Sequence, residues 1–498
     1  MSSAHKAFSG MTWSVVVNLV NAIYGFIATP MLIHYFGRTE YGLIALATSV
    51  NAYMGLMDMG LSSTNVRFFS NWIAKGDKEK VSGLMQTCTA FYGCVGIINA
   101  IILLVVSYYS SSIFNVTPEQ DIILKEMLWI LAVVAIINWF TSCYGQLISA
   151  TENVAWVQKR TLFTKLLMII VVVLTLVCKF TILQYFIGTI LAGLIVLPAT
   201  IKKVKREAPF VSFAARFNAS IFKEILPYSL GIFSFGIFQY SYKQLQVVIV
   251  GMQGSIPSVT DYGVMTSIAS LVSMVGGVFI QSLLPSSTRI VAKGDKSSYY
   301  RVAYQGTHYI TIILCFCAFG LITVDKDLLM IYVGKDFLHL VPWLNIWLFL
   351  TITSNGSCIS SLILGGSNIK PLTYSSAVAS VSAIAATWFA VPHFGAGGVV
   401  FGMIVYNLIQ QVFYYTYYWR VILKIDTWKI FVKTDLPFIT LGGGLAFILK
   451  NIPHFSNDWI NVFFFGITFA ILYLIGTYFM TGKADKNFVL SLIKRKKE

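Results

Sequence analysis

The sequence has 498 residues, of which 57% are apolar and only 11% are charged. Soluble domains carry about 25% charged residues, and a single core stops growing near about 250 to 300 residues, so a water-soluble protein of this composition is excluded. The seven cysteines form no CxxC pair, which excludes a disulfide scaffold and predicts neither a metal site nor a cofactor. The net charge of +16 must be explained by where the basic residues lie.

Hydrophobic segments dominate the chain from end to end. A helix needs about 20 mostly apolar residues to cross a bilayer, and fourteen segments meet this condition. In chain order they are 9–34, 41–62, 81–108, 127–150, 161–178, 181–200, 225–252, 262–284, 302–324, 338–364, 371–391, 396–419, 436–452 and 460–480. The sequence therefore predicts an all-α polytopic membrane protein with about fourteen transmembrane helices.

Most basic residues fall on the cytoplasmic side of the membrane when the N-terminus is placed in the cytoplasm. Of the 36, cytoplasmic segments receive 28, the outer loops together with the outer end of the thirteenth span receive six, and Lys165 and Lys243 fall deeper within spans. This distribution obeys the positive-inside rule and predicts that both termini are cytoplasmic. The basic excess is thus an orientation signal rather than a nucleic-acid-binding surface. Anionic lipid headgroups are the partners expected for the basic clusters at 202–206 and 494–497.

An internal repeat divides the chain. Residues 74–78 read Ala-Lys-Gly-Asp-Lys and recur identically at 292–296, and a Tyr-Gly pair precedes each copy, at Tyr41 and at Tyr262. These matches predict two parallel copies, as in transporters whose substrate lies between repeats and is exposed alternately to each side. The expected domains are a six-helix bundle over 1–200, a basic cytoplasmic linker over 201–224, a second six-helix bundle over 225–419, and two further helices with a basic tail over 420–498.

Short motifs in the first part of the chain carry a family resemblance. They are Phe36-Gly37, Tyr41-Gly42, Asp58-Met59-Gly60-Leu61, Arg67 and Gly76-Asp77-Lys78. This set resembles the signature region of the Wzx-type flippases that export polysaccharides, within the superfamily of multidrug extruders and lipid flippases. The span count and the arrangement of six, six and two spans match that family over essentially the whole chain.

The resemblance implies a secondary transporter of the bacterial inner membrane. Its substrate would be an undecaprenyl-pyrophosphate-linked oligosaccharide, moved from the inner to the outer leaflet by alternating access. The product would be a surface polysaccharide such as O-antigen, and a polysaccharide polymerase and a chain-length regulator would be its partner proteins. Composition and periodicity alone say nothing about the lipid carrier.

Polar side chains within spans are costly, so each is a candidate functional residue. In the seventh span, Gln239, Tyr242, Lys243 and Gln246 recur at helical spacing and share one face. The Lys243 ammonium is suited to attract a pyrophosphate or an acidic sugar. The alternative is that Lys243 extends to the membrane surface while the glutamines face neighbouring helices.

Amide side chains on other spans are suited to sugar hydroxyls, because they donate and accept hydrogen bonds without a charge to desolvate. The candidate substrate contacts of this kind are Asn18 and Asn21 in the first span, Asn138 and Gln146 in the fourth, and Asn407 in the twelfth, where Gln411 and Tyr414 continue the same stripe. Hydrogen bonding between helices is the alternative role for each of them.

Three charged residues near the cytoplasmic side complete the candidates. Asp58 is the one acidic residue within the first four spans, and a buried carboxylate suits proton or sodium coupling. Pairing with a basic residue at the helix end is the alternative for Asp58. Arg67 and Arg289 each precede a copy of the repeat and are suited to attract a pyrophosphate at the cytoplasmic mouth, or else to anchor the chain on the inner side.

No nucleotide-binding loop or nucleophile motif occurs in the sequence, so a transporter is favoured over an enzyme. A cation-coupled multidrug extruder of the same superfamily would place an acidic residue deep in the first or seventh span, where this chain has none. A membrane glycosyltransferase or polysaccharide polymerase would need a sizeable outer loop or catalytic carboxylates, and the outer loops are short. An assembly scaffold would not need a polar face within the membrane.

Overall fold

The computed structural model describes residues 3–293, 296–356, 370–422, 424 and 426–481, without the side chains of residues 3–8, 11, 235, 275–303, 355–356, 418 and 422. Every regular element in this part of the chain is a helix, which confirms the prediction of an all-α fold. Two compact units are present: residues 1–267 with 370–406, and residues 268–369 with 407–498. The domain boundaries expected from the repeat stay a prediction.

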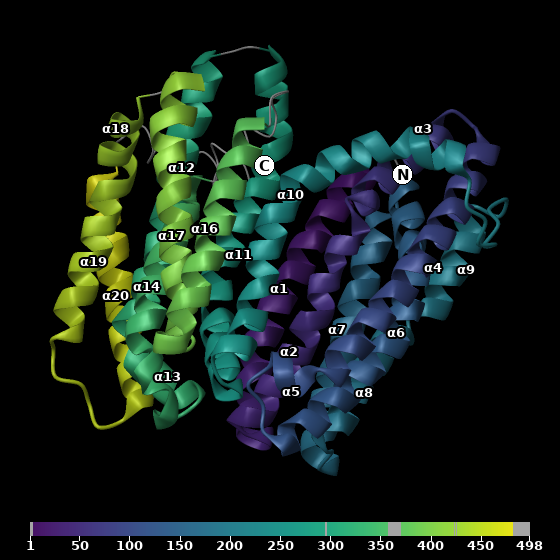
Figure 1. The fold of residues 1–498 in the computed structure, drawn as a ribbon. Coiled ribbons are helices and arrows are strands. Elements are labelled where there is room, and N and C mark those ends of the chain that lie inside the picture. Colours follow the sequence, from purple (N-terminus) through teal and green to yellow (C-terminus); the bar gives the residue numbers. More distant parts are fainter. Residues whose placement is uncertain (1–2, 294–295, 357–369, 423, 425, 482–498) are drawn as a thin grey trace. The chain divides into compact units, whose positions relative to one another are not determined.

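Long helices dominate the first unit, and Figure 1 shows α4, α6, α7 and α8 running side by side. Its elements are α1 (Ser3–Phe36), α2 (Arg38–Tyr53), the 3₁₀ turn η1 (Met54–Asp58), α3 (Leu61–Ala74), α4 (Lys78–Tyr108), α5 (Ser110–Ile113), α6 (Pro118–Ala150), α7 (Val154–Cys178), α8 (Ile182–Leu194), α9 (Leu197–Glu207), α10 (Ala219–Gln253) and α16 (Lys370–Phe394). Two helices, α11 (Ile256–Lys293) and α17 (Gly397–Phe413), begin in the first unit and end in the second.

Shorter helices make up much of the second unit. Its elements are α12 (Lys296–Thr323), α13 (Asp325–Tyr332), η2 (Lys335–Leu340), α14 (Val341–Thr351), η3 (Ile352–Gly356), the π-helical η4 (Tyr414–Ile422), α18 (Thr427–Ile430), η5 (Phe431–Asp435), α19 (Leu436–Lys450) and α20 (Asp458–Met480).

The described residues contain 11 helices long and apolar enough to cross a membrane. The number rises to 12 if α10, which bends by 55° between Ala219–Ser234 and Gly236–Gln253, counts as one span. The expected number of fourteen is therefore not confirmed. The expected span 41–62 is divided among α2, η1 and α3, and α2 has only 16 residues. The expected span 262–284 lies in α11, whose side chains from residue 275 onward are outside the description.

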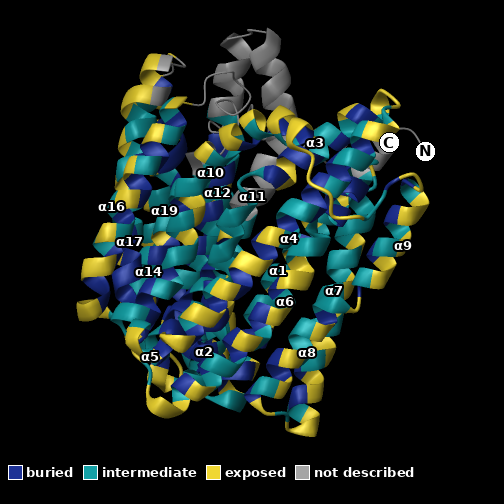
Figure 2. Cartoon of the chain, turned by 45° about the vertical axis from the view of Figure 1, so that its right-hand side comes forward, coloured by how far each residue is buried: buried dark blue, intermediate teal, exposed yellow. Residues whose placement is uncertain are grey.

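Burial divides the helices of the first unit into an inner and a lipid-facing side. Phe69, Trp72, Tyr92 and Leu147 are almost fully buried in the cluster formed by α3, α4 and α6. On α7, large apolar side chains are exposed at every third or fourth position, namely Phe163, Leu166, Ile170, Val173 and Val177. Figure 2 shows such exposed positions along α7 and α8. This stripe identifies the side of α7 that contacts lipid.

The motif Asp58-Met59-Gly60-Leu61 forms the joint between η1 and α3, close to the end of the second expected span. Met59 and Gly60 both adopt left-handed backbone angles, with φ of 51° and 76°, which ends η1 and starts α3 in a new direction. A Cβ on Gly60 would lie 2.8 Å from the carbonyl oxygen of Ser229 in α10. The same serine donates its hydroxyl hydrogen to the Met59 carbonyl at 2.6 Å. Glycine is therefore required here both by the backbone angle and by the close approach of α10.

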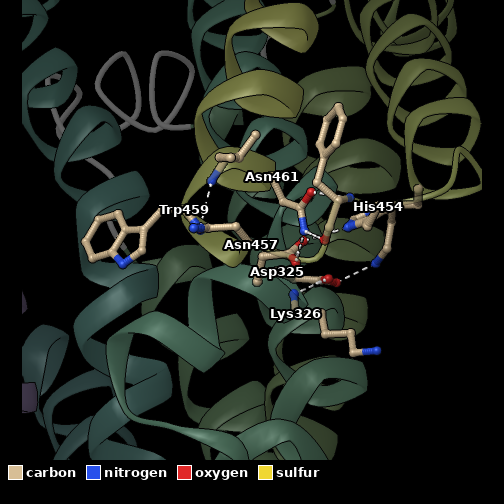
Figure 3. Close-up of polar contacts among 10 residues, drawn as sticks. Asp325, Lys326, His454, Asn457, Trp459 and Asn461 are labelled. Carbon is tan, nitrogen blue, oxygen red and sulfur yellow. Dashed lines mark hydrogen bonds and ion pairs between the residues drawn. The ribbon is translucent and has the colours of Figure 1, made fainter.

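A polar cluster attaches the last two helices to the second unit. Asp327 of α13 accepts hydrogen bonds from Asn461 Nδ2 and His454 Nδ1, each at 2.8 Å. Asp325 forms an ion pair with Lys450 at the end of α19. Figure 3 shows Asp325, His454 and Asn461 gathered at this point. Both carboxylates are buried, so the contacts fix α19 and α20 against α13.

Replacing Gly60 by alanine is expected to destabilise the protein more than the same change at Gly76. Both glycines have positive φ, but a Cβ on Gly76 would meet no atom within 4 Å. Gly76→Ala therefore reports only the backbone strain, about 1 to 2 kcal/mol, whereas Gly60→Ala adds a clash with α10. Thermal unfolding of the purified variants, monitored by size-exclusion chromatography, measures the difference between their midpoints. Equal midpoints for the two variants would contradict the proposed close contact.

Candidate functional site

A cavity of about 330 Å³ lies inside the first unit, where α1, α2, α8, α10 and α11 meet. We call it the tyrosine cavity, because hydroxyl-bearing side chains dominate its polar wall. They are Tyr24, Thr29, Tyr41, Thr48, Ser49, Tyr185, Tyr262, Thr266 and Ser267. None of the described residues that line it carries a charge. Such a wall can donate and accept hydrogen bonds without desolvating an ion.

The two copies of the Tyr-Gly pair come together at the tyrosine cavity. Tyr41 and Tyr262 both line it, and a Cβ on Gly263 would lie 3.4 Å from the Tyr41 ring. A Cβ on Gly42 would lie 2.5 Å from the carbonyl oxygen of Ile256, closer than real Cβ atoms approach. Gly42 therefore lets α2 and α11 approach closely near their N-terminal ends.

Hydrogen bonds fix the helices around this cavity. Thr29 Oγ1 of α1 lies 3.1 Å from the Tyr41 hydroxyl and 2.9 Å from Ser267 Oγ. Nearby, Arg38 at the start of α2 forms an ion pair with Asp261 of α11, whose carboxylate is buried. These contacts join α1, α2 and α11, so the cavity wall is preorganised. Hydroxyls together with flat tyrosine rings are suited to bind a sugar.

Asp58 is the centre of a network of polar side chains. Its Oδ1 accepts hydrogen bonds from Ser62 Oγ and from the Tyr92 hydroxyl, each at 2.7 Å, and its Oδ2 accepts from the Ser62 backbone N–H at 3.1 Å. Gln146 Nε2 donates to Ser62 Oγ and to Tyr92, at 2.9 and 3.2 Å. Asn65 Nδ2 donates to Gln146 Oε1 at 2.9 Å. The network joins η1 and α3 to α4 and α6.

No basic side chain among the described residues forms an ion pair with Asp58. The carboxylate is instead satisfied by hydroxyl and backbone donors, and it lies at the N-terminus of α3, where a negative charge is favourable. Gln146, expected to contact sugar, belongs to this network. Ion coupling by Asp58 stays a prediction.

Substitution of Asp58 is expected to distinguish its structural contacts from ion coupling. Asp58→Ala leaves the Tyr92 hydroxyl without its acceptor and should lower stability by about 1 to 3 kcal/mol, whereas Asp58→Asn keeps an acceptor oxygen and should cost less. Thermal midpoints of the purified variants measure this order. Ion coupling further requires that Asp58→Asn protein be present in normal amounts in the membrane and fail to transport. Normal transport by that variant would exclude the coupling role.

The four polar residues predicted on the seventh span have different surroundings in α10. Three contact neighbouring helices of the first unit: Gln239 Nε2 donates to Ser376 Oγ at 3.1 Å, the Tyr242 ring stacks on Tyr406 with centroids 4.6 Å apart, and Gln246 Oε1 accepts from the Tyr262 hydroxyl at 3.3 Å. Lys243 is exposed and has no hydrogen bond or ion pair with any described residue. Only Lys243 is thus left available for an external anion.

Lys243→Ala is expected to reduce export at least tenfold if the ammonium attracts an anionic group of the substrate. Loss of a desolvated charge contact costs about 2 to 5 kcal/mol, and Lys243→Arg should retain part of the activity because the charge is kept. Lys223→Ala, which removes an exposed lysine near the start of the same helix, is the matched control. Surface polysaccharide, normalised to the amount of protein in the membrane, is the readout. Wild-type export by Lys243→Ala would exclude the contact.

The asparagines predicted in the first half are not gathered in one site. Asn18 and Asn21 lie on α1, and Asn21 Oδ1 is buried without a hydrogen-bond partner in the described part of the chain. Asn138 lines a separate cavity between α6 and α7. Both Asn21 and Asn138 therefore retain polar atoms that a substrate could bind.

Of the two predicted arginines, only Arg67 has a side chain that the structure describes. The Arg67 guanidinium is exposed and lies over the Tyr228 ring, 4.0 Å from its centroid, a cation–π contact that orients the side chain. The side chain of Arg289 lies outside the described residues. Their proposed contact with pyrophosphate stays a prediction.

The second unit contains a larger cavity beside the predicted stripe of the twelfth span. Thr353 Oγ1 donates to Asn407 Oδ1 at 2.8 Å, and Gln411 Nε2 donates to the Thr353 carbonyl at 3.1 Å. The adjoining cavity measures about 650 Å³, and Thr353, Gln411 and Tyr415 are among its lining residues. Asp435, also in its wall, is buried and accepts a hydrogen bond from the Tyr415 hydroxyl at 3.0 Å. Sequence reasoning missed Asp435 because it directly precedes the expected span.

A family model described as "Polysaccharide biosynthesis protein" matches residues 35–342. No match is found among curated protein sequences. The match over most of the chain supports the resemblance stated from the motifs.

Solved structures show the same fold along nearly the whole chain. A lipid II flippase, MurJ, in an inward closed conformation has a TM-score of 0.69 at 14% identity, with 94% of this chain and 98% of that chain covered. An inward-facing multidrug resistance transporter of the MATE family in the MOP superfamily has a TM-score of 0.58 at 13% identity, with coverages of 88% and 100%. The eukaryotic MATE transporter AtDTX14 gives 0.56 at 14% identity, with coverages of 86% and 98%. At these identities the likeness concerns the fold alone.

Proposed function

The chain belongs to the polysaccharide biosynthesis protein family, and from this premise we propose that it is a flippase that moves a lipid-linked oligosaccharide from the inner to the outer leaflet of a membrane. The observation that carries the proposal is the combination of this family with a fold that matches a lipid II flippase along 94% of the chain. A protein of this kind acts as a transporter rather than as a catalyst.

The interior of the first unit supports an uncharged sugar as part of the cargo. The tyrosine cavity has room for about one or two sugar rings and offers hydroxyl donors and acceptors from several helices. Lys243 and Asn21 are available for further contacts, because no described residue satisfies the Lys243 ammonium or Asn21 Oδ1. Undecaprenyl pyrophosphate is the carrier that the family resemblance implies.

The distribution of basic residues supports a cytoplasmic N-terminus and C-terminus, and the family resemblance implies the bacterial inner membrane. Anionic headgroups would then contact the basic segment at 202–206, and a polysaccharide polymerase and a chain-length regulator would use the exported product. Alternating access is the expected mode of movement.

A cation-coupled multidrug extruder shares the fold but is less well supported. Extruders of cationic drugs need an anionic site in the membrane, and neither α1 nor the second segment of α10, Gly236–Gln253, contains an acidic residue. The tyrosine cavity likewise has no carboxylate among its described lining residues. The family match favours polysaccharide biosynthesis over drug export.

Deletion of the gene in its own host is expected to abolish one surface polysaccharide and to leave its lipid-linked oligosaccharide in the inner leaflet. A flippase acts after synthesis of this intermediate, so the intermediate should accumulate rather than disappear. Mass spectrometry of extracted lipids and staining of the surface polymer measure both effects, with the plasmid-borne wild-type gene as the control. Unchanged polysaccharide together with increased sensitivity to cationic drugs would contradict the proposal and support the extruder.

A further inference from the structure

A second cavity, of about 290 Å³, lies inside the first unit between α6, α7 and the segment that joins α8 to α9. Asn138, Thr141 and Ser142 of α6 form one wall, and Arg160 and Lys165 of α7 are part of the opposite wall. We call it the cationic cavity. It is distinct from the tyrosine cavity, with which it shares no lining residue.

We propose that the cationic cavity binds a phosphate group, carried either by a diphosphate-linked lipid or by a phospholipid headgroup. The inference about a diphosphate-linked lipid rests on the proposed function, whereas binding of a phosphate group as such does not. The cavity is large enough for a diphosphate and too small for a whole oligosaccharide.

The two basic side chains in this cavity have no carboxylate partner in the part of the chain that the structure describes. Arg160 Nη1 donates to the Thr200 hydroxyl at 3.3 Å, and Lys165 Nζ lies 4.9 Å from the centre of the Tyr24 ring. Neither contact neutralises a charge. An uncompensated charge within a membrane span is costly, so a bound anion would remove a penalty that the protein otherwise carries.

The orientation of α7 directs Lys165 into a cavity of the protein rather than toward the lipid chains. The exposed apolar stripe of α7 includes Phe163, Ile170 and Val177, and the helical period places Lys165 outside this stripe, about 120° to 160° around the helix from these positions. Lys165 is about 16 Å along the helix axis from the first residue of α7, and Arg160 is about 9 Å along it. Both therefore lie away from the end of α7, and both line the cationic cavity.

Hydrogen-bond donors in the same cavity lack partners. The Nε of Arg160 and the hydroxyl of Ser142 are buried with no hydrogen-bond partner. A guanidinium presents a planar fork of donors that matches phosphate oxygens, and an ammonium adds a second positive charge. Two cations with adjacent hydroxyl and amide groups suit a doubly charged phosphate better than a neutral sugar.

The test is ligand binding by the purified full-length protein in a neutral maltoside detergent. The probes are undecaprenyl diphosphate without sugar, inorganic pyrophosphate, and phosphatidylglycerol, each titrated while the thermal midpoint and the dissociation constant are measured. The variants are Arg160→Gln, Lys165→Gln and the double variant. Lys159→Gln is the matched control, because Lys159 is the adjacent cation, is exposed, and lies over the Trp13 ring outside the cavity.

We expect at least one phosphate probe to bind wild type and Lys159→Gln equally, and to bind the double variant at least tenfold more weakly. The ligand-free midpoint of the double variant should stay the same or rise, because uncompensated charges within a membrane span are removed. Preference for undecaprenyl diphosphate identifies the lipid-linked substrate as the source of the bound phosphate group. Preference for phosphatidylglycerol identifies a phospholipid of the bilayer as that source.

Equal affinity of wild type and double variant for every probe, or no binding of any probe to wild type, would overturn the proposal. If the double variant is not folded, Lys165→Met provides the same comparison with a side chain of similar length. The gene deletion tests the flippase function separately: polysaccharide lost on deletion, with unchanged probe binding in the double variant, rejects this site and leaves the flippase function standing.

Discussion

The hydrocarbon layer offers no hydrogen-bond partners, so every polar group within it must be satisfied by the protein itself. This constraint accounts for the helical backbone and for the apolar stripe that α7 presents outward. It also accounts for the network around Asp58, in which Ser62, Tyr92 and Gln146 satisfy one another across η1, α4 and α6. Where the constraint is met, polar residues serve the fold. Where it is not met, as at Ser142 and Arg160, the proposed phosphate group would be the partner.

Close contacts at glycine complement these polar contacts. Gly42 lets α11 approach α2, and Gly60 lets α10 approach the joint between η1 and α3. Two of the motifs that suggested a family from the sequence thus have a structural basis, since Gly42 and Gly60 each occupy a position that a side chain would block. The Tyr-Gly repeat additionally contributes Tyr41 and Tyr262 to the wall of one cavity. One of the family motifs therefore contributes Tyr41 to the candidate sugar site.

Much of the fold was predictable because hydrophobic length and period report directly on membrane spans. Twelve of the fourteen expected segments correspond to spanning helices when the bent α10 is counted once. The segment 41–62 is divided among three helical pieces in the structure, and hydropathy does not register the left-handed backbone at Met59 and Gly60 near its end.

The site was harder to predict, because partners come from distant parts of the chain. Helical spacing correctly placed Lys243 and Gln246 on one helix, yet Gln246 bonds Tyr262 while Lys243 has no described partner. Arg160 directly precedes the expected span 161–178, and the structure places it in the wall of the cationic cavity. Lys165 could be recognised from the sequence as unusual, because it is one of two basic residues that lie deep within the expected spans. Which residues would line a cavity with it depended on helix packing, which the sequence pattern does not specify.

The most direct test of the central claim is leaflet transfer by the purified protein in proteoliposomes. Lipid-linked oligosaccharide, extracted from the deletion strain and labelled on its sugar, would be reconstituted into both leaflets, and a membrane-impermeant oxidant would then destroy the label that faces outward. The flippase account predicts that vesicles containing the folded protein lose the whole labelled pool, whereas protein-free vesicles lose only the outer-leaflet share. Loss of the outer-leaflet share alone in both kinds of vesicle would contradict it.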